Sequence, residues 1–195
     1  AAELSREAFE AAVAVVQSGV AGVPANRRAS VEAGALLFRR SSPEMLQAHA
    51  VKSAGPLVRA LVEKPADAEL QAGILGSLEV LLEQAGPSLR PLAPALQTAL
   101  LKVLEGPAEL HAAAVRVLGL LAPVATRAEA LVKALGKAPR RAAQLDALSE
   151  VLRVLGSARS AEVEREARAV LDAASADGEE AVRSAAARTA ALLSV

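Results

Sequence analysis

Apolar residues recur every three or four positions along most of the chain, in stretches that proline, glycine and short polar runs separate. This spacing predicts amphipathic helices, and no stretch shows the strict alternation that a half-buried strand requires. We therefore predict an all-α protein whose helices come in pairs. The expected first helices are Glu3–Gln17, Pro43–Lys64, Ser88–Glu105, Arg127–Lys137 and Ala161–Ala174. The expected second helices are Asn26–Arg40, Ala68–Gln84, Ala108–Leu121, Arg140–Leu155 and Glu179–Leu193.

The second helices recur at intervals of about 40 residues, with one contracted interval of about 30, where the first helix Arg127–Lys137 is short. The alignment pairs Arg28, Leu70, Leu110, Arg140 and Val182, and further along it pairs Leu36, Leu78, Leu118, Leu148 and Ala190. A single hairpin cannot bury its own apolar face, so successive hairpins must bury it against each other. We predict a right-handed α-solenoid of about five HEAT-type helical hairpins, because ten helices fit a four-helix bundle poorly.

The same breaks divide the expected array into units. We expect a single array over residues 1–195, with units at about 1–41, 42–85, 86–124, 125–156 and 157–195. The chain opens without methionine and closes on an apolar stretch that looks uncapped, so we expect a segment of a longer solenoid. Gly55-Pro56 should kink or break the helix Pro43–Lys64, and clustered prolines should delay the next regular helix until Pro91 or Pro94.

Composition sets the character of the core. Hydrophobic residues make up 53% of the chain and aromatic residues only 1%, with Phe9 and Phe38 as the two rings. The core must therefore consist of Ala, Leu and Val, which favour helices and let them approach closely. The absence of cysteine excludes disulfides and thiolate metal sites.

Charge and aromatic content argue against nucleic acid as the partner, and the length of the apolar runs argues against a membrane. Lys and Arg total 22, as do Asp and Glu, so the formal net charge is zero. Proteins that grip nucleic acid through phosphates normally carry excess positive charge, and base stacking needs aromatic platforms that this chain lacks. No apolar run approaches the roughly 18 residues that a membrane span needs, and we expect no membrane partner.

No constellation of residues points to catalysis. The two histidines, His49 and His111, lie far apart in the sequence, and we interpret both as ordinary, partly exposed side chains. The isolated glycines match no phosphate-binding loop. We predict no catalytic residue, no cofactor, no metal and no small-molecule substrate. The alternative, a glycosylase or lyase on a helical-repeat scaffold, would need a cleft with several buried carboxylates.

Two arginine pairs are the candidate partner-binding residues. Arg27-Arg28 and Arg140-Arg141 both stand at the start of an expected second helix. A cation there gains nothing from the helix dipole, which is positive at that end, so local folding does not explain them. We favour a solvated, highly charged edge, and contact with a partner's acidic groups is the alternative.

A run of motifs resembles a known family. Gly55-Pro56-Leu57-Val58-Arg59 is followed by an expected helix and then by Leu89-Arg90-Pro91-Leu92-Ala93-Pro94-Ala95-Leu96-Gln97-Thr98. These elements resemble consecutive units in the C-terminal HEAT-repeat region of the general-control (Gcn1-type) translational activator family. The resemblance covers roughly Ser42 to Leu193, with departures at Ala95, Ala99-Leu100 and Leu110-His111.

The resemblance implies a function. It implies a cytoplasmic scaffold on translating or collided ribosomes, active in translation regulation and the integrated stress response. In that family the C-terminal HEAT region contacts the RWD domain of the protein kinase that phosphorylates initiation factor two. None of the family's basic residues can be matched to a position here. A ribosome-contacting or spacer segment, or an unrelated HEAT-type adaptor, is the alternative.

Overall fold

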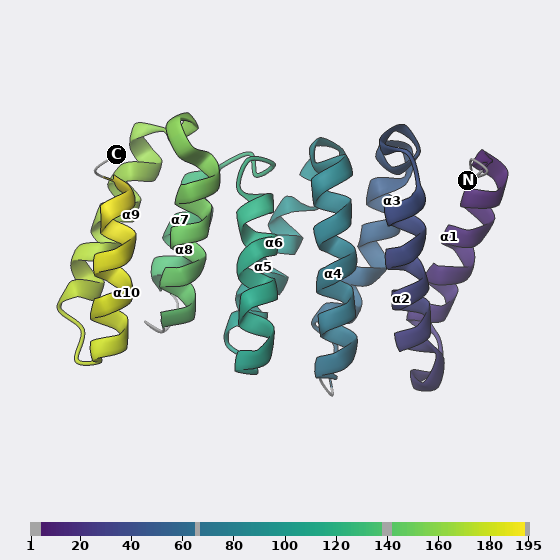
Figure 1. The fold of residues 1–195 in the computed structure, drawn as a ribbon, viewed down its shortest axis with the longest axis horizontal. Coiled ribbons are helices and arrows are strands. Elements are labelled where there is room, and N and C mark those ends of the chain that lie inside the picture. Colours follow the sequence, from purple (N-terminus) through teal and green to yellow (C-terminus); the bar gives the residue numbers. More distant parts are fainter. Residues whose placement is uncertain (1–4, 65–66, 138–141, 194–195) are drawn as a thin grey trace. The chain divides into compact units, whose positions relative to one another are not determined.

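The computed structural model describes residues 5–64, 67–137 and 142–193, and within these residues the chain is helical with no strand (Figure 1). The α-helices are α1 (Arg6–Ala21), α2 (Pro24–Arg40), α3 (Pro43–Leu61), α4 (Ala68–Ala85), α5 (Ala93–Leu104), α6 (His111–Leu121), α7 (Ala128–Lys137), α8 (Ala142–Leu155), α9 (Ala161–Ser175) and α10 (Glu180–Ala190). Short 3₁₀ helices are η1 (Gly86–Leu92), η2 (Ala108–Leu110), η3 (Gly156–Ala158) and η4 (Ala191–Leu193).

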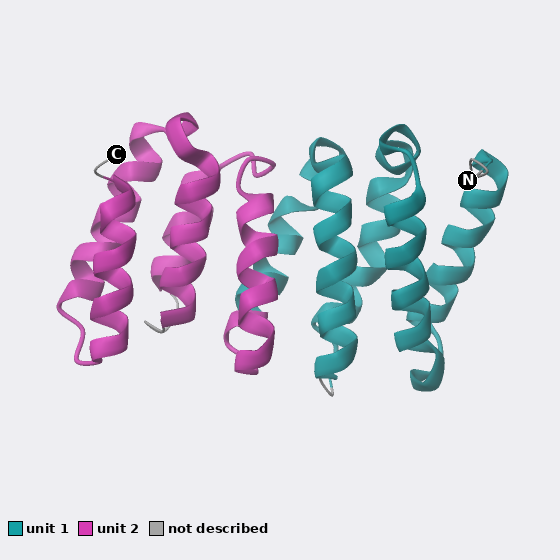
Figure 2. Ribbon diagram, in the orientation of Figure 1, with its two compact units in different colours: residues 1–102 teal, residues 103–195 magenta. Residues whose placement is uncertain are grey.

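The chain forms two compact units, residues 1–102 and 103–195 (Figure 2). In unit 1, α1 packs on both α2 and α3, and α4 packs on both α2 and α3. In unit 2, α8 packs on α6, α7 and α10, and α9 packs on α7 and α10. First helices therefore lie on first helices and second helices on second helices, which is the stacking of a solenoid. The predicted all-α solenoid of helical hairpins is confirmed, while a single array over the whole chain stays a prediction.

Side-chain caps explain where several helices begin. Ser5, Ser42, Asp67 and Ser160 each accept a hydrogen bond from the backbone N–H three residues later, at 3.2, 3.4, 3.0 and 3.2 Å. Such caps satisfy one of the donors that a helix start leaves unpaired. Pro24 and Pro43 occupy the first turns of α2 and α3, where the missing N–H costs nothing. Pro24, Ser42-Pro43 and Ser160 are among the breaks from which the sequence predicted the hairpins.

Of the kink or break predicted at Gly55-Pro56, the break is wrong, because α3 runs without interruption from Pro43 to Leu61. Pro56 cannot donate to the carbonyl of Lys52, one turn earlier, so that carbonyl lacks its helical partner. The side chain of Gln17 in α1 supplies the missing hydrogen bond, with 2.7 Å from its Nε2 to the Lys52 oxygen. A tertiary contact thus compensates for the proline and lets the helix continue.

This contact gives a testable prediction. Gln17→Met keeps the length of the side chain but removes the donor, so we expect the unfolding free energy to fall by about 0.5–1.5 kcal/mol. Gln47→Met, at an exposed position of α3, is the matched control and should change stability little. Urea unfolding followed by circular dichroism measures both, and equal effects of the two substitutions would contradict the role of Gln17.

The proline cluster behaves as predicted. Residues Gly86–Leu92 form the 3₁₀ helix η1, and the regular helix α5 begins at Ala93, within the predicted window from Pro91 to Pro94. Pro94 then lies in the first turn of α5, where proline is tolerated.

The core of each unit consists mainly of aliphatic side chains, and both rings belong to unit 1. Phe9 and Phe38 are both fully buried, and the other large buried side chains are Leu and Ile, with Val and Ala completing the core. Two hydroxyls also contribute to stacking between second helices. The Ser77 hydroxyl of α4 lies 3.3 Å from the carbonyl of Val31 in α2, and the Thr189 hydroxyl of α10 lies 3.4 Å from the carbonyl of Leu145 in α8. Each hydroxyl also reaches the carbonyl four residues earlier in its own helix.

One part of the predicted register is wrong. Leu36, which the alignment paired with Leu78, is 59% exposed, whereas Leu78 is fully buried. The Arg27 Nε donates to the carbonyl of Val20 at 2.8 Å, and the Gln71 Nε2 donates to that of Leu61 at 2.9 Å, both at the end of the preceding helix. Arg27 therefore corresponds to Gln71, two positions from the predicted register, because α2 begins at Pro24 and not at Asn26.

Candidate partner-binding site

Arg27 lies at the junction of α1, α2 and the end of α3. Besides its bond to the Val20 carbonyl, its Nη2 lies 2.5 Å from Oε2 of Glu63. Its side chain is only 17% exposed. The guanidinium therefore caps the C-terminal end of α1, where a cation is favourable, and pairs with a carboxylate that follows α3.

Arg28 binds the N-terminal end of α4. Its Nη2 lies 3.0 and 2.9 Å from the two carboxylate oxygens of Asp67, and its Nε lies 3.1 Å from one of them. It also pairs with Glu69. Asp67 at the same time caps α4 by accepting from the N–H of Leu70 at 3.0 Å. Arg28 thus neutralises acids that the α4 dipole favours, and both arginines of this pair have partners inside unit 1.

The sequence interpretation missed these acidic partners. Glu63, Asp67 and Glu69 lie 36, 39 and 41 residues from the arginines that they contact. That separation is about one repeat. The sequence signal that could have identified these partners is an acidic residue one repeat period after each arginine. The contacts between one hairpin and the next therefore explain why Arg27 and Arg28 stand at the start of α2. A binding partner is not needed to explain them. A role of the pair in partner binding stays a proposal.

Arg140 and Arg141, the other two predicted partner-binding residues, lie outside the described residues. Of the four predicted positions, the structure thus places Arg27 and Arg28, and it brings these two together at one edge of unit 1.

The electrostatics of Asp67 give a pH prediction. The hydrogen bond from the N–H of Leu70, and after it the bond from Arg28, lower the pKa of Asp67 below its ordinary value of 3.8. A lowered pKa in the folded state means that the ionised carboxylate stabilises the fold above about pH 3.8, and that this contribution disappears as the pH falls through the folded-state value. Asp67→Asn should therefore reduce stability at neutral pH and make progressively less difference below pH 3.8.

The measurement is urea unfolding of the protein and of Asp67→Asn at neutral pH and at several values below about 4. Asp172→Asn, at an exposed position of α9, is the control and should show no comparable convergence. A stability difference between the protein and Asp67→Asn that does not depend on pH would contradict the role of the charge.

The two histidines occupy separate, structural positions. The His49 ring packs against Phe9 with 5.4 Å between centroids, and its Nε2 lies 3.4 Å from Oε1 of Glu10. The Nε2 of His111 lies 3.1 Å from the carbonyl of Gly106, in the turn before α6. Among the residues that the structure describes, no three or more His, Cys, Asp or Glu side chains gather in a way that could hold a metal ion. Within the same residues, no helix combines the length and apolar character that crossing a membrane requires.

Sequence comparison finds one informative relative and no matching family model. The chain is 30% identical over 103 residues to the human protein named stalled ribosome sensor GCN1. The match covers 52% of this chain but only 4% of that protein, so the chain spans a small part of the relative's length.

Comparison with solved structures finds helical-repeat proteins. An engineered protein from the Northeast Structural Genomics Consortium matches 97% of this chain and 84% of its own, with a TM-score of 0.59 and 16% sequence identity. A designed armadillo repeat protein in complex with the peptide (KR)4 matches 96% of this chain and 82% of its own, with a TM-score of 0.56 and 14% identity. At these identities the likeness shows the fold, which is that of a helical-repeat solenoid.

Proposed function

We propose that this chain is a non-catalytic protein-binding scaffold that resembles a HEAT segment of the Gcn1-type translational activators and engages the RWD domain of the kinase that phosphorylates initiation factor two. The observation that carries the proposal is stacking of first helix on first helix and second helix on second helix within each unit. This packing uses the faces between hairpins for stability and leaves outer helix faces for recognition. The match to human GCN1 supports the choice of family.

The ionisable groups favour a scaffold over an enzyme. A catalytic acid usually needs a raised pKa, which burial in a cleft provides. Here the pKa of Glu129 is lowered by its hydrogen bond from Arg127 at 2.8 Å, and that of Glu150 by its hydrogen bonds from Arg153. Both pairings occur between near neighbours in the sequence, and the Arg127 and Arg153 side chains are 76% and 64% exposed, so these are local ion pairs at the surface.

The name of the human relative suggests the cellular setting. A segment of a stalled-ribosome sensor would act in the cytoplasm, close to ribosomes, in translation regulation and the integrated stress response. In that setting the segment serves as a kinase activator, by holding the RWD domain of the kinase near the ribosome.

The test is calorimetric titration of this chain with the isolated RWD domain of the kinase. We expect saturable one-to-one binding. The double reversal Arg140→Glu with Arg141→Glu should weaken it about tenfold or more, because the partner's acidic groups would face glutamates in place of arginines. Arg39→Glu with Arg40→Glu, at the exposed end of α2, is the matched control and should bind like the unchanged chain. Absence of binding by a chain whose circular dichroism shows folded helices would refute the assignment of this partner.

A ribosome-contacting role is the second candidate, and salt distinguishes it. If the chain binds ribosomal RNA through phosphates, the logarithm of its affinity should fall steeply and linearly with the logarithm of the salt concentration. Binding to a folded domain should depend on salt less strongly. Titration of purified ribosomes at several salt concentrations separates the two candidates.

A further inference from the structure

Second helices contact each other through the same hydrogen bond in both units. In unit 1 the Ser77 hydroxyl of α4 reaches the carbonyl of Val31 in α2, and in unit 2 the Thr189 hydroxyl of α10 reaches the carbonyl of Leu145 in α8. Val31 therefore corresponds to Leu145, and Ser77 corresponds to Thr189. This correspondence lets the α2–α4 contact be compared with the α8–α10 contact position by position.

In unit 2 the positions beside this contact form an ion pair. The carboxylate of Asp146 in α8 lies 3.4 Å from Nη2 of Arg188 in α10, and the two side chains are 53% and 62% exposed. By the correspondence, the counterpart of Asp146 is Glu32 of α2, and the counterpart of Arg188 is Gly76 of α4. Unit 1 therefore carries the acid of this pair and lacks the cation.

Glu32 has no partner of its own. Its side chain is exposed, and none of the described residues forms an ion pair or a hydrogen bond with it. Arg28, one turn earlier in α2, is already held by Asp67 and Glu69. The neighbouring helix α4 contains three glutamates and no lysine or arginine, so the local charge favours a cation from outside the chain.

Gly76 leaves open the place where its counterpart carries an arginine. No atom lies within 4 Å of a Cβ built at Gly76, whereas a Cβ at Gly73 would stand 3.0 Å from the Cγ1 of Val31. Ala72, one turn before Gly76, is small and exposed as well. Glycine inside a helix costs stability relative to alanine, and it permits another molecule to approach the backbone closely. Packing against the described residues explains Gly73 but does not explain Gly76.

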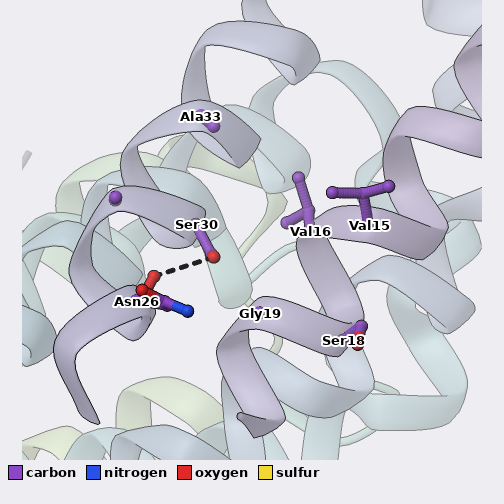
Figure 3. Close-up of a pocket in the computed structure, with 8 residues that line it drawn as sticks. Val15, Val16, Ser18, Gly19, Asn26, Ser30 and Ala33 are labelled. Atoms are coloured by element: carbon purple, nitrogen blue, oxygen red, sulfur yellow. Dashed lines mark hydrogen bonds between the residues drawn. The ribbon is translucent and has the colours of Figure 1, made fainter. Parts of the chain in front are cut away.

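The open surface at Gly76 is separate from the pocket between α1 and α2. Figure 3 shows that pocket, with Ser30 and Ala33 of α2 across from Val15 and Val16 of α1. It lies on the side of α2 that corresponds to the stacking side of α4, and Glu32 is not among its lining residues. The missing cation belongs to α4, so it stays missing whatever packs on that side of α2.

We infer that Glu32 and the open surface of Gly76 receive an arginine from a basic segment of a partner protein. The guanidinium takes the place that Arg188 holds in unit 2 and donates to the Glu32 carboxylate, while its aliphatic chain lies over Ala72 and Gly76. Arginine suits the position because its planar group binds a carboxylate through two hydrogen bonds. The acidic surroundings repel nucleic acid and anionic membranes. The inference does not rest on the proposed contact through Arg140 and Arg141, which has the opposite polarity.

The probe is the peptide Gly-Ala-Arg-Ala-Gly with both ends blocked, titrated into the full chain while the backbone amides are followed by NMR. We expect the amide signals of Glu32 and Gly76 to shift saturably. The same peptide with citrulline, the neutral analogue of arginine, should bind about fivefold more weakly, because one favourable surface ion pair is lost. Equal affinities of the two peptides would overturn the inference, as would shifts that gather away from Glu32 and Gly76.

Variants of the chain test the same site from the other side. Glu32→Gln removes the acid and Gly76→Arg fills the open place, so each should weaken binding of the arginine peptide by about fivefold. Glu83→Gln removes an exposed charge from the same helix, two turns beyond Gly76, and is the matched control; it should change the affinity by less than about twofold. Undiminished binding of the peptide to Glu32→Gln would contradict the role of that carboxylate.

Thermal unfolding without any peptide gives a second measurement, which does not involve the RWD domain either. Gly76→Arg should melt about 1–3 °C higher than Gly76→Gln, because an arginine at this position pairs with Glu32 as Arg188 pairs with Asp146. The difference should disappear when both substitutions are combined with Glu32→Gln. Equal melting temperatures of Gly76→Arg and Gly76→Gln would show that an arginine at this position does not reach Glu32, and would overturn the inference.

Discussion

Leu78→Ala is expected to lower the unfolding free energy by about 2–5 kcal/mol, and Leu36→Ala by less than about 0.5 kcal/mol. Leu78 lies inside unit 1 with no exposed surface, so its truncation loses burial and leaves a cavity. Leu36 is 59% exposed, so the same truncation loses little buried apolar surface and leaves no cavity. Urea unfolding of the three proteins measures the difference.

This pair of substitutions is its own control, because the chemical change is identical and the two leucines occupy positions that the repeat alignment of the sequence treats as equivalent. Equal losses of stability at the two positions would show that both side chains are buried to the same degree. That result would contradict the register of α2 that the Arg27 and Gln71 contacts define.

Gly73→Leu is expected to destabilise the protein by about 1–3 kcal/mol, because even a Cβ at this position stands 3.0 Å from the Cγ1 of Val31 and a larger side chain must push α2 away from α4. Gly76→Leu, one helical turn further along α4, is the matched control. No atom lies within 4 Å of a Cβ at Gly76, and leucine favours helix over glycine, so this substitution should be neutral or stabilising by up to about 1 kcal/mol.

Thermal unfolding followed by circular dichroism measures both glycine variants. If Gly73→Leu were as well tolerated as Gly76→Leu, the close contact between α2 and α4 at this point would be wrong. A loss of stability in both variants would instead indicate that glycine is needed in α4 for a reason other than this contact.

The positions of the helices could be predicted from the sequence because their boundaries are local. Ser42 with Pro43, and Ser160, begin helices through caps that depend only on neighbouring residues. The helical spacing of Leu and Val between such boundaries then fixed the class of fold, since the apolar face of each hairpin needs another hairpin to cover it.

Features that depend on tertiary contacts could not be predicted in the same way. The carbonyl of Lys52, which Pro56 leaves without its helical donor, accepts a hydrogen bond from Gln17, 35 residues away. The register of α2 depends on a helix start at Pro24, ahead of the polar residue that the pattern indicated. A side chain that satisfies a distant backbone group leaves no periodic signal in the sequence.

The candidate site shows the same division. The sequence singled out Arg27 and Arg28 because a helix start is an unfavourable place for a cation. It did not identify Glu63 and Asp67 as their partners, because that required knowing how one hairpin stacks on the next.

The central claim is that neighbouring hairpins stabilise each other through direct contact of their second helices, and a double-mutant cycle between Val31→Ala and Gly73→Leu tests it most directly. Truncation of Val31 makes room for the larger side chain at position 73, so the effects of the two substitutions should not add. The loss of unfolding free energy in the double variant should be smaller than the sum of the two single losses by about 0.5–3 kcal/mol. Strict additivity of the two substitutions would mean that Val31 and Gly73 do not meet, and it would contradict the stacking of α2 on α4.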